Sequence, residues 1–330
     1  MGFPISRLRR LRKNEKIREL VSDVHLDKSD LVYPVFVKED LINEGKIASI
    51  PGQSYSPLSG VGRIAEKCET LGVHGLLLFG IPREKDVLGR KAYSDGGIVQ
   101  KAIRLVKKKS DLVVFTDVCL CQYTTHGHCG VLTKDGVNND RTLKLLAKIA
   151  LSHARAGADF VAPSAMMDGQ VKAIRDALDE EGFDDTGIMS YSKFASSFYG
   201  PFRDAVDSAP KRVKGLPYIT DRSTYQMDFR SLSQAMREIS LDIDEGADIV
   251  LIKPALPYLD VIKEARRRFN VPIAAYQVSG EYTMLKLAVE RGLLDEKRSF
   301  LESLTSIKRS GASFIVTYAA LDVARWLSAG

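Results

Sequence analysis

The sequence predicts an α/β protein folded as a (β/α)8 TIM barrel with an N-terminal extended or helical arm. Eight short apolar runs alternate with helical stretches from about residue 30 to the end of the chain. Each run is apolar throughout rather than alternating, as expected for parallel strands covered on both faces. Side chains capable of chemistry follow many different runs, which is typical of the C-terminal mouth of such a barrel.

The predicted strands and helices alternate in order along the chain. The strands span residues 31–37, 75–80, 112–118, 159–163, 187–192, 248–253, 272–278 and 314–318. Helical stretches include 60–71, 97–109, 141–156, 168–182, 231–246, 258–268 and 281–291. This order favours parallel strands joined by helical crossovers. A doubly wound sheet is the alternative, but no GxGxxG turn follows the first strand.

We expect two parts in the chain. Residues 1–30 form the arm and contact other subunits, whereas residues 31–330 form the catalytic barrel. Two connections are longer than barrel loops usually are, 119–140 and 194–230. Each of these connections is a candidate lid over the mouth of the barrel.

The composition is that of a soluble globular protein, with 45% hydrophobic and 27% charged residues among 330. No apolar run approaches membrane-spanning length and no short apolar core follows the basic N-terminus, so we expect no membrane segment and no secretory signal. Of four cysteines, three lie within eleven positions, which is not a disulfide framework. The expected compartment is the cytoplasm.

The net charge is +6, and basic residues crowd into the N-terminal stretch at Arg7, Arg9, Arg10, Arg12 and Lys13. Nucleic-acid binding is one interpretation of this cluster. No aromatic interleaving or nucleic-acid motif accompanies it. An amphipathic arm that packs on another subunit through Leu8 and Leu11 is the favoured interpretation, and we expect no nucleic-acid partner.

Two lysines close strand-like runs, Lys193 after GIMSYS and Lys253 after DIVLI. Burial disfavours an ammonium ion, and a second cation nearby disfavours it further. A neutral amine attacks a ketone to form a Schiff base. Most lysines in proteins are solvated or ion-paired. For Lys253 considered alone, the structural and the functional interpretation carry equal weight. Two lysines at two strand ends favour a reaction that holds two carbonyl substrates at once.

Cys119, Cys121 and Cys129 in the run DVCLCQYTTHGHCG predict a metal site. Three thiolates suit a soft divalent ion, zinc first, and leave one coordination position open as in catalytic zinc sites. A closed structural site completed by His126 or His128 is the alternative. The catalytic form is favoured because the loop continues directly from a strand that ends near Asp117.

Other polar residues lie at predicted strand ends or in the second lid. Ser164, Ser279 and Tyr318 follow or end strands, and each could equally be a satisfied hydroxyl at the rim. Arg203 and Arg222 could hold an acidic substrate, because a guanidinium group binds carboxylates in a planar, two-pronged fashion. The alternative is surface ion pairing, for instance of Arg203 with Asp204 or Asp207. The ordinary interpretation of Glu238 is a solvated helix face.

The chain resembles the porphobilinogen synthase family, also called 5-aminolevulinate dehydratase, nearly end to end. The matching segments are RLRRLR, YPVFV, LLLFG, DVCLCQYTTHGHCG, GADFVAPSAMMDG, MSYSKFASSFYGPFRDA, GADIVLIKPALPYLD, AAYQVSGEY and TYAALDVARWL. The cysteine loop and the KFASSFYGPFRDA segment are specific to this family. The resemblance implies condensation of two 5-aminolevulinate molecules to porphobilinogen, with loss of two waters, in heme biosynthesis.

The resemblance also implies roles for individual residues. Lys253 would form a Schiff base with the first substrate and Lys193 with the second. Ser279 and Tyr318 would bind the first carboxylate. Lid residues that would hold the second carboxylate are Arg203, Arg222 and Gln226. Asp117 is the candidate general base, and the other matching pocket positions are Ser164, Tyr199, Phe202 and Tyr276.

For metals and assembly, the resemblance implies the zinc-dependent branch of the family, an allosteric Mg²⁺ ligand at Glu238, and a homo-octamer in which the arm wraps a neighbour. Two positions depart from the family's common pattern: Ala165 replaces an aspartate and Gln170 an arginine.

Two other functions stay open. A class I aldolase would depend on Lys253 alone and tolerate substitution of Lys193, and a nucleic-acid-binding barrel would show a steeply salt-dependent affinity.

Overall fold

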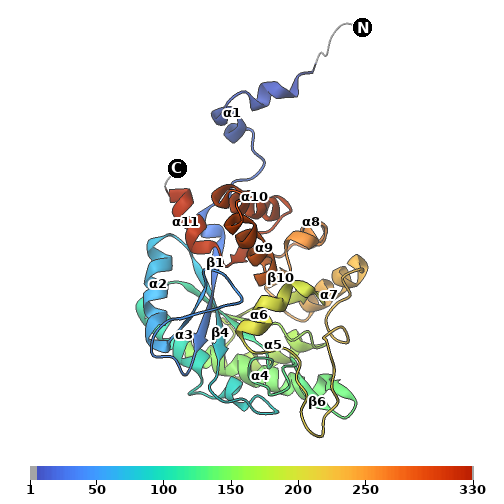
Figure 1. Ribbon diagram of the computed structural model, residues 1–330. Coiled ribbons are helices and arrows are strands. Elements are labelled where there is room, and N and C mark those ends of the chain that lie inside the picture. Colours follow the sequence, from blue (N-terminus) through green and yellow to red (C-terminus); the bar gives the residue numbers. More distant parts are fainter. Residues whose placement is uncertain (1–5, 329–330) are drawn as a thin grey trace.

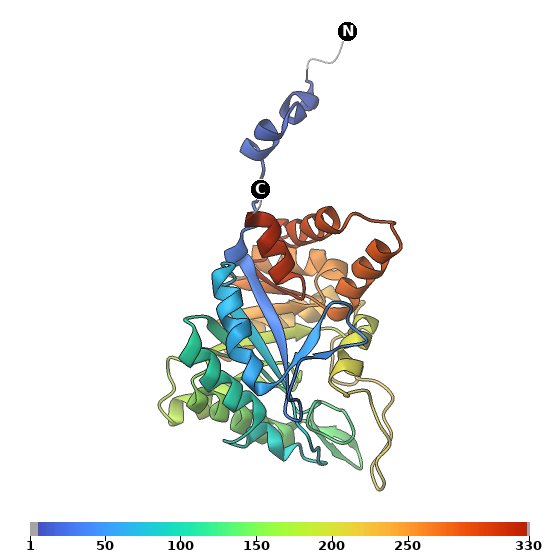
Figure 2. The ribbon, with the colours of Figure 1, turned by 60° about the vertical axis from the view of Figure 1, so that its left-hand side comes forward.

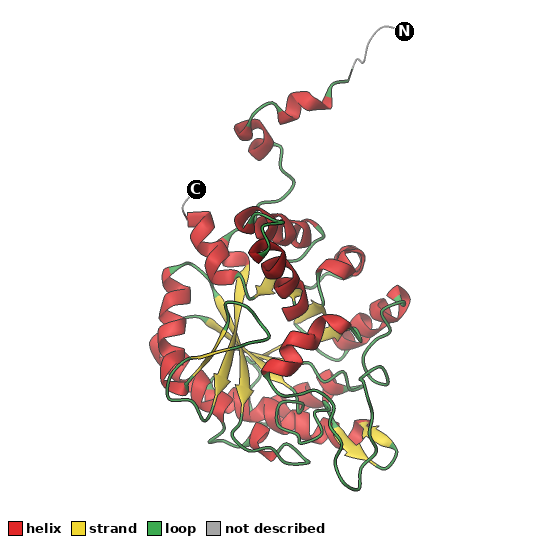
Figure 3. Ribbon diagram, in the orientation of Figure 1, coloured by secondary structure: helices red, strands yellow, loops and turns green. Residues whose placement is uncertain are grey.

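A closed ring of eight parallel strands forms the centre of the molecule, in a computed structural model that describes residues 6–328 (Figures 1 and 3). The strands are β1 (Leu31–Lys38), β4 (Gly75–Ile81), β5 (Val113–Val118), β8 (Phe160–Pro163), β9 (Gly187–Lys193), β10 (Ile249–Lys253), β11 (Ile273–Gln277) and β12 (Phe314–Thr317). Each lies within two residues of its predicted range. The ring closes because β1 pairs with both β4 and β12, with Leu31 opposite Ile315. The predicted (β/α)8 barrel is confirmed.

Helices surround the barrel and cover its outer face (Figure 3). They are α2 (Val61–Thr70), α3 (Ile98–Lys109), α4 (Asn139–Ala156), α5 (Gln170–Glu180), α7 (Leu232–Asp244), α8 (Leu259–Arg268), α9 (Ser279–Glu290), α10 (Glu296–Arg309) and α11 (Ala320–Ser328). The helices are amphipathic and turn their apolar side chains inward, as Ile103 and Val106 of α3 do. Both α9 and α10 lie between β11 and β12, and α11 follows the last strand; neither α10 nor α11 was among the predicted helices.

The N-terminal segment extends away from the barrel (Figures 1 and 2). It contains a 3₁₀ turn, η1 (Leu8–Arg12), and the short helix α1 (Glu15–Leu20). Leu8 is 71% exposed and Leu20 is 84% exposed. The first five residues of the predicted arm, 1–5, lie outside the described residues. A function of the arm in subunit contacts stays a prediction.

The two long connections contact one another. Connection 119–140 contains a hairpin of β6 (Val131–Thr133) and β7 (Gly136–Asn138). Connection 194–230 begins with η5 (Ser197–Tyr199) and α6 (Gly200–Ala205) and continues mainly as irregular chain. The backbone N–H of Lys211 donates to the carbonyl of His126, which joins the two segments. A short pair of strands, β2 (Gly45–Lys46) and β3 (Ser54–Ser56), extends the sheet beside β1.

Within residues 6–328, no helix combines the length and the apolar character that crossing a membrane requires.

Candidate active site

Lys193 and Lys253 are directly paired at the ends of the neighbouring strands β9 and β10. Side chains opposite each other in a sheet project from the same face, so both amines enter the same space. Each lysine is only 5% exposed. The two Nζ atoms lie 5.7 Å and 5.3 Å from the centre of one ring, that of Tyr199. The structure therefore brings together the two predicted lysines.

Aromatic rings enclose the amine of Lys253. Its Nζ lies 4.3 Å from the ring centre of Tyr276, 5.1 Å from that of Phe202 and 5.4 Å from that of Tyr191. Burial, followed by the neighbouring Lys193 charge, lowers the pKa of the Lys253 amine to about 7. A large fraction of Lys253 is therefore neutral, and hence nucleophilic, near neutral pH.

Asp117 and Ser164 lie beside the lysines. The Lys193 amine donates to the carbonyl of Ser164 at 3.1 Å. The Ser164 hydroxyl donates to one oxygen of Asp117 at 2.6 Å, and Gln122 donates to the other at 2.9 Å. Burial raises the pKa of Asp117, while these hydrogen bonds and the two lysines act to lower it. Such a carboxyl is suited to exchange a proton near the amines.

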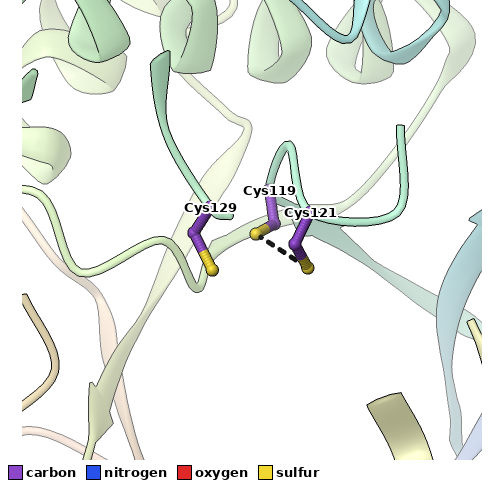
Figure 4. A group of neighbouring side chains, drawn as sticks. All are labelled: Cys119, Cys121 and Cys129. Carbon is purple, nitrogen blue, oxygen red and sulfur yellow. Dashed lines mark hydrogen bonds between the residues drawn. The ribbon is translucent and has the colours of Figure 1, made fainter. Parts of the chain in front are cut away.

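The three predicted cysteines converge on one point (Figure 4). Their sulfur atoms lie within 4.8 Å of one another, and all three residues are buried. The neighbouring thiols lower the pKa of Cys129 through hydrogen bonding, whereas burial raises the pKa of Cys119. Three clustered sulfurs fit a soft divalent metal ion and provide three protein ligands.

The histidines of the cysteine loop are engaged elsewhere. His126 contacts the carbonyl of Val87 through Nε2 and accepts the N–H of His128 through Nδ1. His128 contacts the Tyr225 hydroxyl and the carbonyl of Ile219. Among the described residues, the cluster of candidate ligands contains the cysteines alone. The geometry thus favours an open three-thiolate site over a closed site completed by histidine.

Arg222 joins the second long connection to the cysteine loop. One terminal nitrogen donates to the carbonyls of Gly127 at 2.8 Å and Ser208 at 2.6 Å. Burial acts to lower the pKa of the Arg222 guanidinium, but the three cysteines outweigh this and the net shift is upward. Its Nε is buried without a hydrogen-bond partner in the described residues.

Arg203 and Gln226 also present buried polar atoms without partners. The Arg203 guanidinium stacks 5.6 Å from the ring centre of Tyr199, and its Nε is unpaired among residues 6–328. Gln226 is 3% exposed, and neither polar atom of its side chain has a partner there. Asp207, an alternative ion-pair partner for Arg203, pairs with Lys85 and Lys211 instead. Because buried polar groups are normally satisfied, these atoms indicate where a polar ligand would bind.

The remaining predicted residues lie at the ends of β11 and β12. The Tyr276 hydroxyl donates to that of Tyr318 at 3.1 Å, close to the Lys253 amine that rests on the Tyr276 ring. The Ser279 hydroxyl accepts the backbone N–H of Phe202 at 3.0 Å. The site thus has hydroxyl groups on the Lys253 side and guanidinium groups on the side of the cysteine loop.

A family model for delta-aminolevulinic acid dehydratase matches residues 5–326. The chain belongs to the delta-aminolevulinic acid dehydratase family. The protein therefore has the activity of this family, that of a lyase called porphobilinogen synthase. This activity belongs to porphyrin biosynthesis.

Relatives and a solved structure match over nearly their whole lengths. The dehydratase of Methanothermus sociabilis is 55% identical over 324 residues, 98% of this chain and 99% of that protein. The Bacillus subtilis dehydratase is 47% identical over 331 residues, 99% of this chain and 100% of that protein. The crystal structure of the Toxoplasma gondii dehydratase, in complex with the reaction product porphobilinogen, has a TM-score of 0.92 and 43% identity, and covers 97% of this chain and 91% of that chain.

Glu238 lies apart from the paired lysines of this dehydratase-family site. It lines a cavity of about 300 Å³ together with Asp168 and Gln226, and neither Lys193 nor Lys253 borders that cavity. Glu238 is half-buried, so it does not lie on a fully solvated helix face, and its function as a metal ligand stays a prediction. Burial raises the pKa of Glu238, and the charges of Asp168 and Glu245 add to the effect. The helix packs this face against the barrel and the second long connection, which the local sequence does not reveal.

Both departures from the family pattern are buried. Ala165 is fully buried and has no polar side-chain atom. Gln170 accepts the N–H of Met167 at 3.3 Å and donates to the carbonyl of Pro163 at 3.4 Å. Gln170 therefore holds the turn between β8 and α5 through backbone contacts.

Three residues of the site were missed from the sequence. Gln122 orients the general-base candidate, and Tyr191 contributes a ring beside a lysine. Lys85 donates to the carbonyls of Val206 at 3.1 Å and Asp207 at 2.6 Å, and so pins the second long connection. Tyr191 lies two positions before a strand-ending lysine, so strand periodicity could have found it. No signal in the sequence indicates Gln122 or Lys85.

Proposed function

We propose that the chain condenses two 5-aminolevulinate molecules to porphobilinogen, with loss of two waters, through Schiff bases on both Lys253 and Lys193. Each amine would add to a substrate ketone and release one water as the imine forms. The observation that carries the proposal is the direct pairing of two buried lysines on neighbouring strands. An aldolase that uses one lysine has no need of the second.

The surrounding residues supply binding and proton transfer in this proposal. Ser279 and Tyr318 bind the carboxylate of the first substrate, beside Lys253. Arg203, Arg222 and Gln226 bind that of the second, which would satisfy their unpaired atoms. Ser164, Tyr199, Phe202 and Tyr276 line the pocket. Asp117 removes the carbon-bound proton that permits the C–C bond to form, because it lies beside the amines with a raised pKa.

We assign zinc to Cys119, Cys121 and Cys129 because a cluster of three thiolates is the donor set that soft divalent ions prefer. A zinc ion held there would supply Lewis acidity toward a substrate oxygen or amine. Glu238 is proposed as a magnesium ligand outside the catalytic pocket, supported by its half-buried position beside Asp168.

We further propose a cytoplasmic homo-octamer assembled from dimers, with the arm, residues 1–30, wrapping a neighbouring subunit. The exposed apolar side chains of Leu8 and Leu20 support this proposal, because residues 6–328 leave both of them largely uncovered. We propose neither nucleic acid nor a membrane as a partner. Connections 119–140 and 194–230 act as lids, since both lysines are too buried for substrate to enter without movement.

Borohydride trapping with labelled 5-aminolevulinate tests the proposal directly. Peptide mapping of the reduced protein should locate label on both Lys253 and Lys193. Lys193→Ala should lose turnover by about 10³-fold while Lys253 still traps substrate. Label on Lys253 alone, with most turnover retained in Lys193→Ala, would favour the single-lysine aldolase.

A further inference from the structure

Glu281 is a fully buried carboxylate close to the proposed site, without a function in the mechanism above. It lies in the first turn of α9, two residues after Ser279. Its oxygens accept three backbone N–H groups, from Val278 at 2.7 Å, Leu256 at 2.5 Å and Ala255 at 3.2 Å. Three such bonds satisfy a carboxylate that would otherwise be costly to bury.

Capping of the helix accounts for only one of these bonds. A glutamate at the third position of a helix commonly bonds back to the N–H at the start of that helix, as Glu281 does to Val278. Ala255 and Leu256 belong to a different segment, the connection that follows β10. They lie two and three residues beyond Lys253. Glu281 therefore ties the end of β10 to the end of β11.

The two segments that Glu281 joins carry the two halves of the first substrate site. Lys253 ends one segment, and Ser279 begins the helix that follows the other. Lys193 is held by other contacts, since its amine donates to Ser164 and its carbonyl accepts the N–H of Met227. A change at Glu281 should therefore affect the two lysines unequally.

We propose that Glu281 is a positioning residue that sets the distance between the Lys253 amine and the Ser279 hydroxyl, and so aligns the ketone and the carboxylate of the first substrate. This inference rests on the proposed two-lysine function. Small displacements of a reacting group are costly, because a productive geometry tolerates errors well below 1 Å.

The test compares Glu281→Gln with Asp248→Asn by borohydride trapping of labelled 5-aminolevulinate. Glutamine has the same size but turns an NH₂ group toward N–H donors. Asp248 also accepts a backbone N–H, from Ile188 at 2.7 Å, but at the opposite end of β10. Glu281→Gln should reduce trapping at Lys253 about tenfold and raise KM more than it lowers kcat, with trapping at Lys193 changed by less than about twofold. Asp248→Asn should leave both lysines unchanged.

Equal losses at both lysines, or the same pattern in Asp248→Asn, would overturn the inference and reduce Glu281 to a general stabilising residue. Glu281→Asp retains the charge but is one methylene shorter, so it should show the same bias toward Lys253 if Glu281→Gln does not fold. Unchanged trapping in both Glu281 variants also refutes the inference. A wild-type protein that traps substrate at neither lysine would overturn the proposed function, and the inference with it.

Discussion

Lys253 and Lys193 occupy paired positions, yet their amines meet different surroundings. Aromatic rings enclose Lys253, whereas Lys193 donates to the carbonyl of Ser164. The electrostatic cost of an ammonium ion among rings is partly offset by cation–π attraction, but burial dominates and the pKa of Lys253 falls to about 7. The surroundings of Lys253 thus favour the neutral, nucleophilic amine.

The lowered pKa of Lys253 predicts the pH dependence of trapping. An amine with a pKa of about 7 is protonated below that value and neutral above it. The initial rate of trapping at Lys253 should therefore fall about tenfold for each pH unit below 7 and level off above 7. Lys193→Met removes a cation and should move the midpoint to higher pH. A rate that keeps rising to about pH 10, as for an ordinary lysine, would contradict this prediction.

Metal removal should abolish activity through the three cysteines. We expect dialysis against a strong chelator to reduce turnover at least about 100-fold, zinc to restore it, and magnesium alone to fail, because thiolates prefer soft ions. Metal content measured beside activity checks the prediction. Full turnover in a preparation free of metal would rule out a catalytic metal.

At the scale of elements, Lys85 and Arg222 are two of the side chains that hold the second long connection in place, alongside the contact of Lys211 with His126. Lys85 donates to two of its carbonyls, and Arg222 donates to a third, that of Ser208. The contact to Ser208 is buried, and a buried carbonyl that loses its donor costs about 1–3 kcal/mol. The position of the connection should therefore be sensitive to these two side chains.

Lys85→Met should loosen the second long connection. We expect KM for 5-aminolevulinate to rise about tenfold, with a smaller change in kcat, and proteolysis between residues 206 and 218 to accelerate. The matched control is Lys211→Met, which removes an exposed ion pair with Asp207 and should change KM by less than about twofold. Equal effects of the two substitutions would contradict a pinning function for Lys85.

Gly280 permits close contact between α9 and η5. A Cβ atom at Gly280 would lie 2.5 Å from the carbonyl oxygen of Phe198, which is too close for any atom pair of this kind. Gly280→Ala should lower stability by about 1–3 kcal/mol and raise KM, because the displaced turn leads into the helix that carries Phe202. Gly200→Ala is the control, since its Cβ would meet no atom within 4 Å. The free energy of unfolding and the KM of both variants test this prediction.

At the scale of the whole molecule, the barrel and the N-terminal segment are separate in space (Figure 2). After η1 and α1, the chain reaches the barrel at η2 (Lys28–Asp30). There Lys28 contacts Ser328, and Asp30 pairs with Lys308. These contacts hold the base of the segment against α10 and α11. Of the hydrophobic residues between positions 6 and 30, Leu26 is the one that packs against the barrel core.

Deletion of residues 1–22 should leave the barrel folded but reduce the size of the assembly. The exposed leucines of this segment would lose their partner surface, so the mass measured by light scattering should fall below that of the full chain. The far-ultraviolet circular dichroism per barrel residue should stay unchanged. An unchanged assembly mass would contradict a function of the arm in oligomerisation.

Local patterns carried much of the prediction, because a strand or a helix is a property of a short segment. Apolar runs located all eight barrel strands, and the position of Lys193 and Lys253 at strand ends indicated the candidate site. Three cysteines in one short loop can approach one another without contacts between distant segments. The resemblance to the family, based on long shared segments, was confirmed by the comparisons.

Contacts between distant segments could not be read in this way. Lys85 contacts a residue of the second long connection 122 positions away, and Glu281 contacts backbone 26 positions earlier. The half-buried state of Glu238 depends on how its helix packs. Which nitrogens and hydroxyls are left unpaired, and how far burial lowers the pKa of Lys253, depend on the closed ring and the long connections at its mouth. Such properties arise from the summed surroundings of a group in space, and neighbours in sequence supply only a small part of those surroundings.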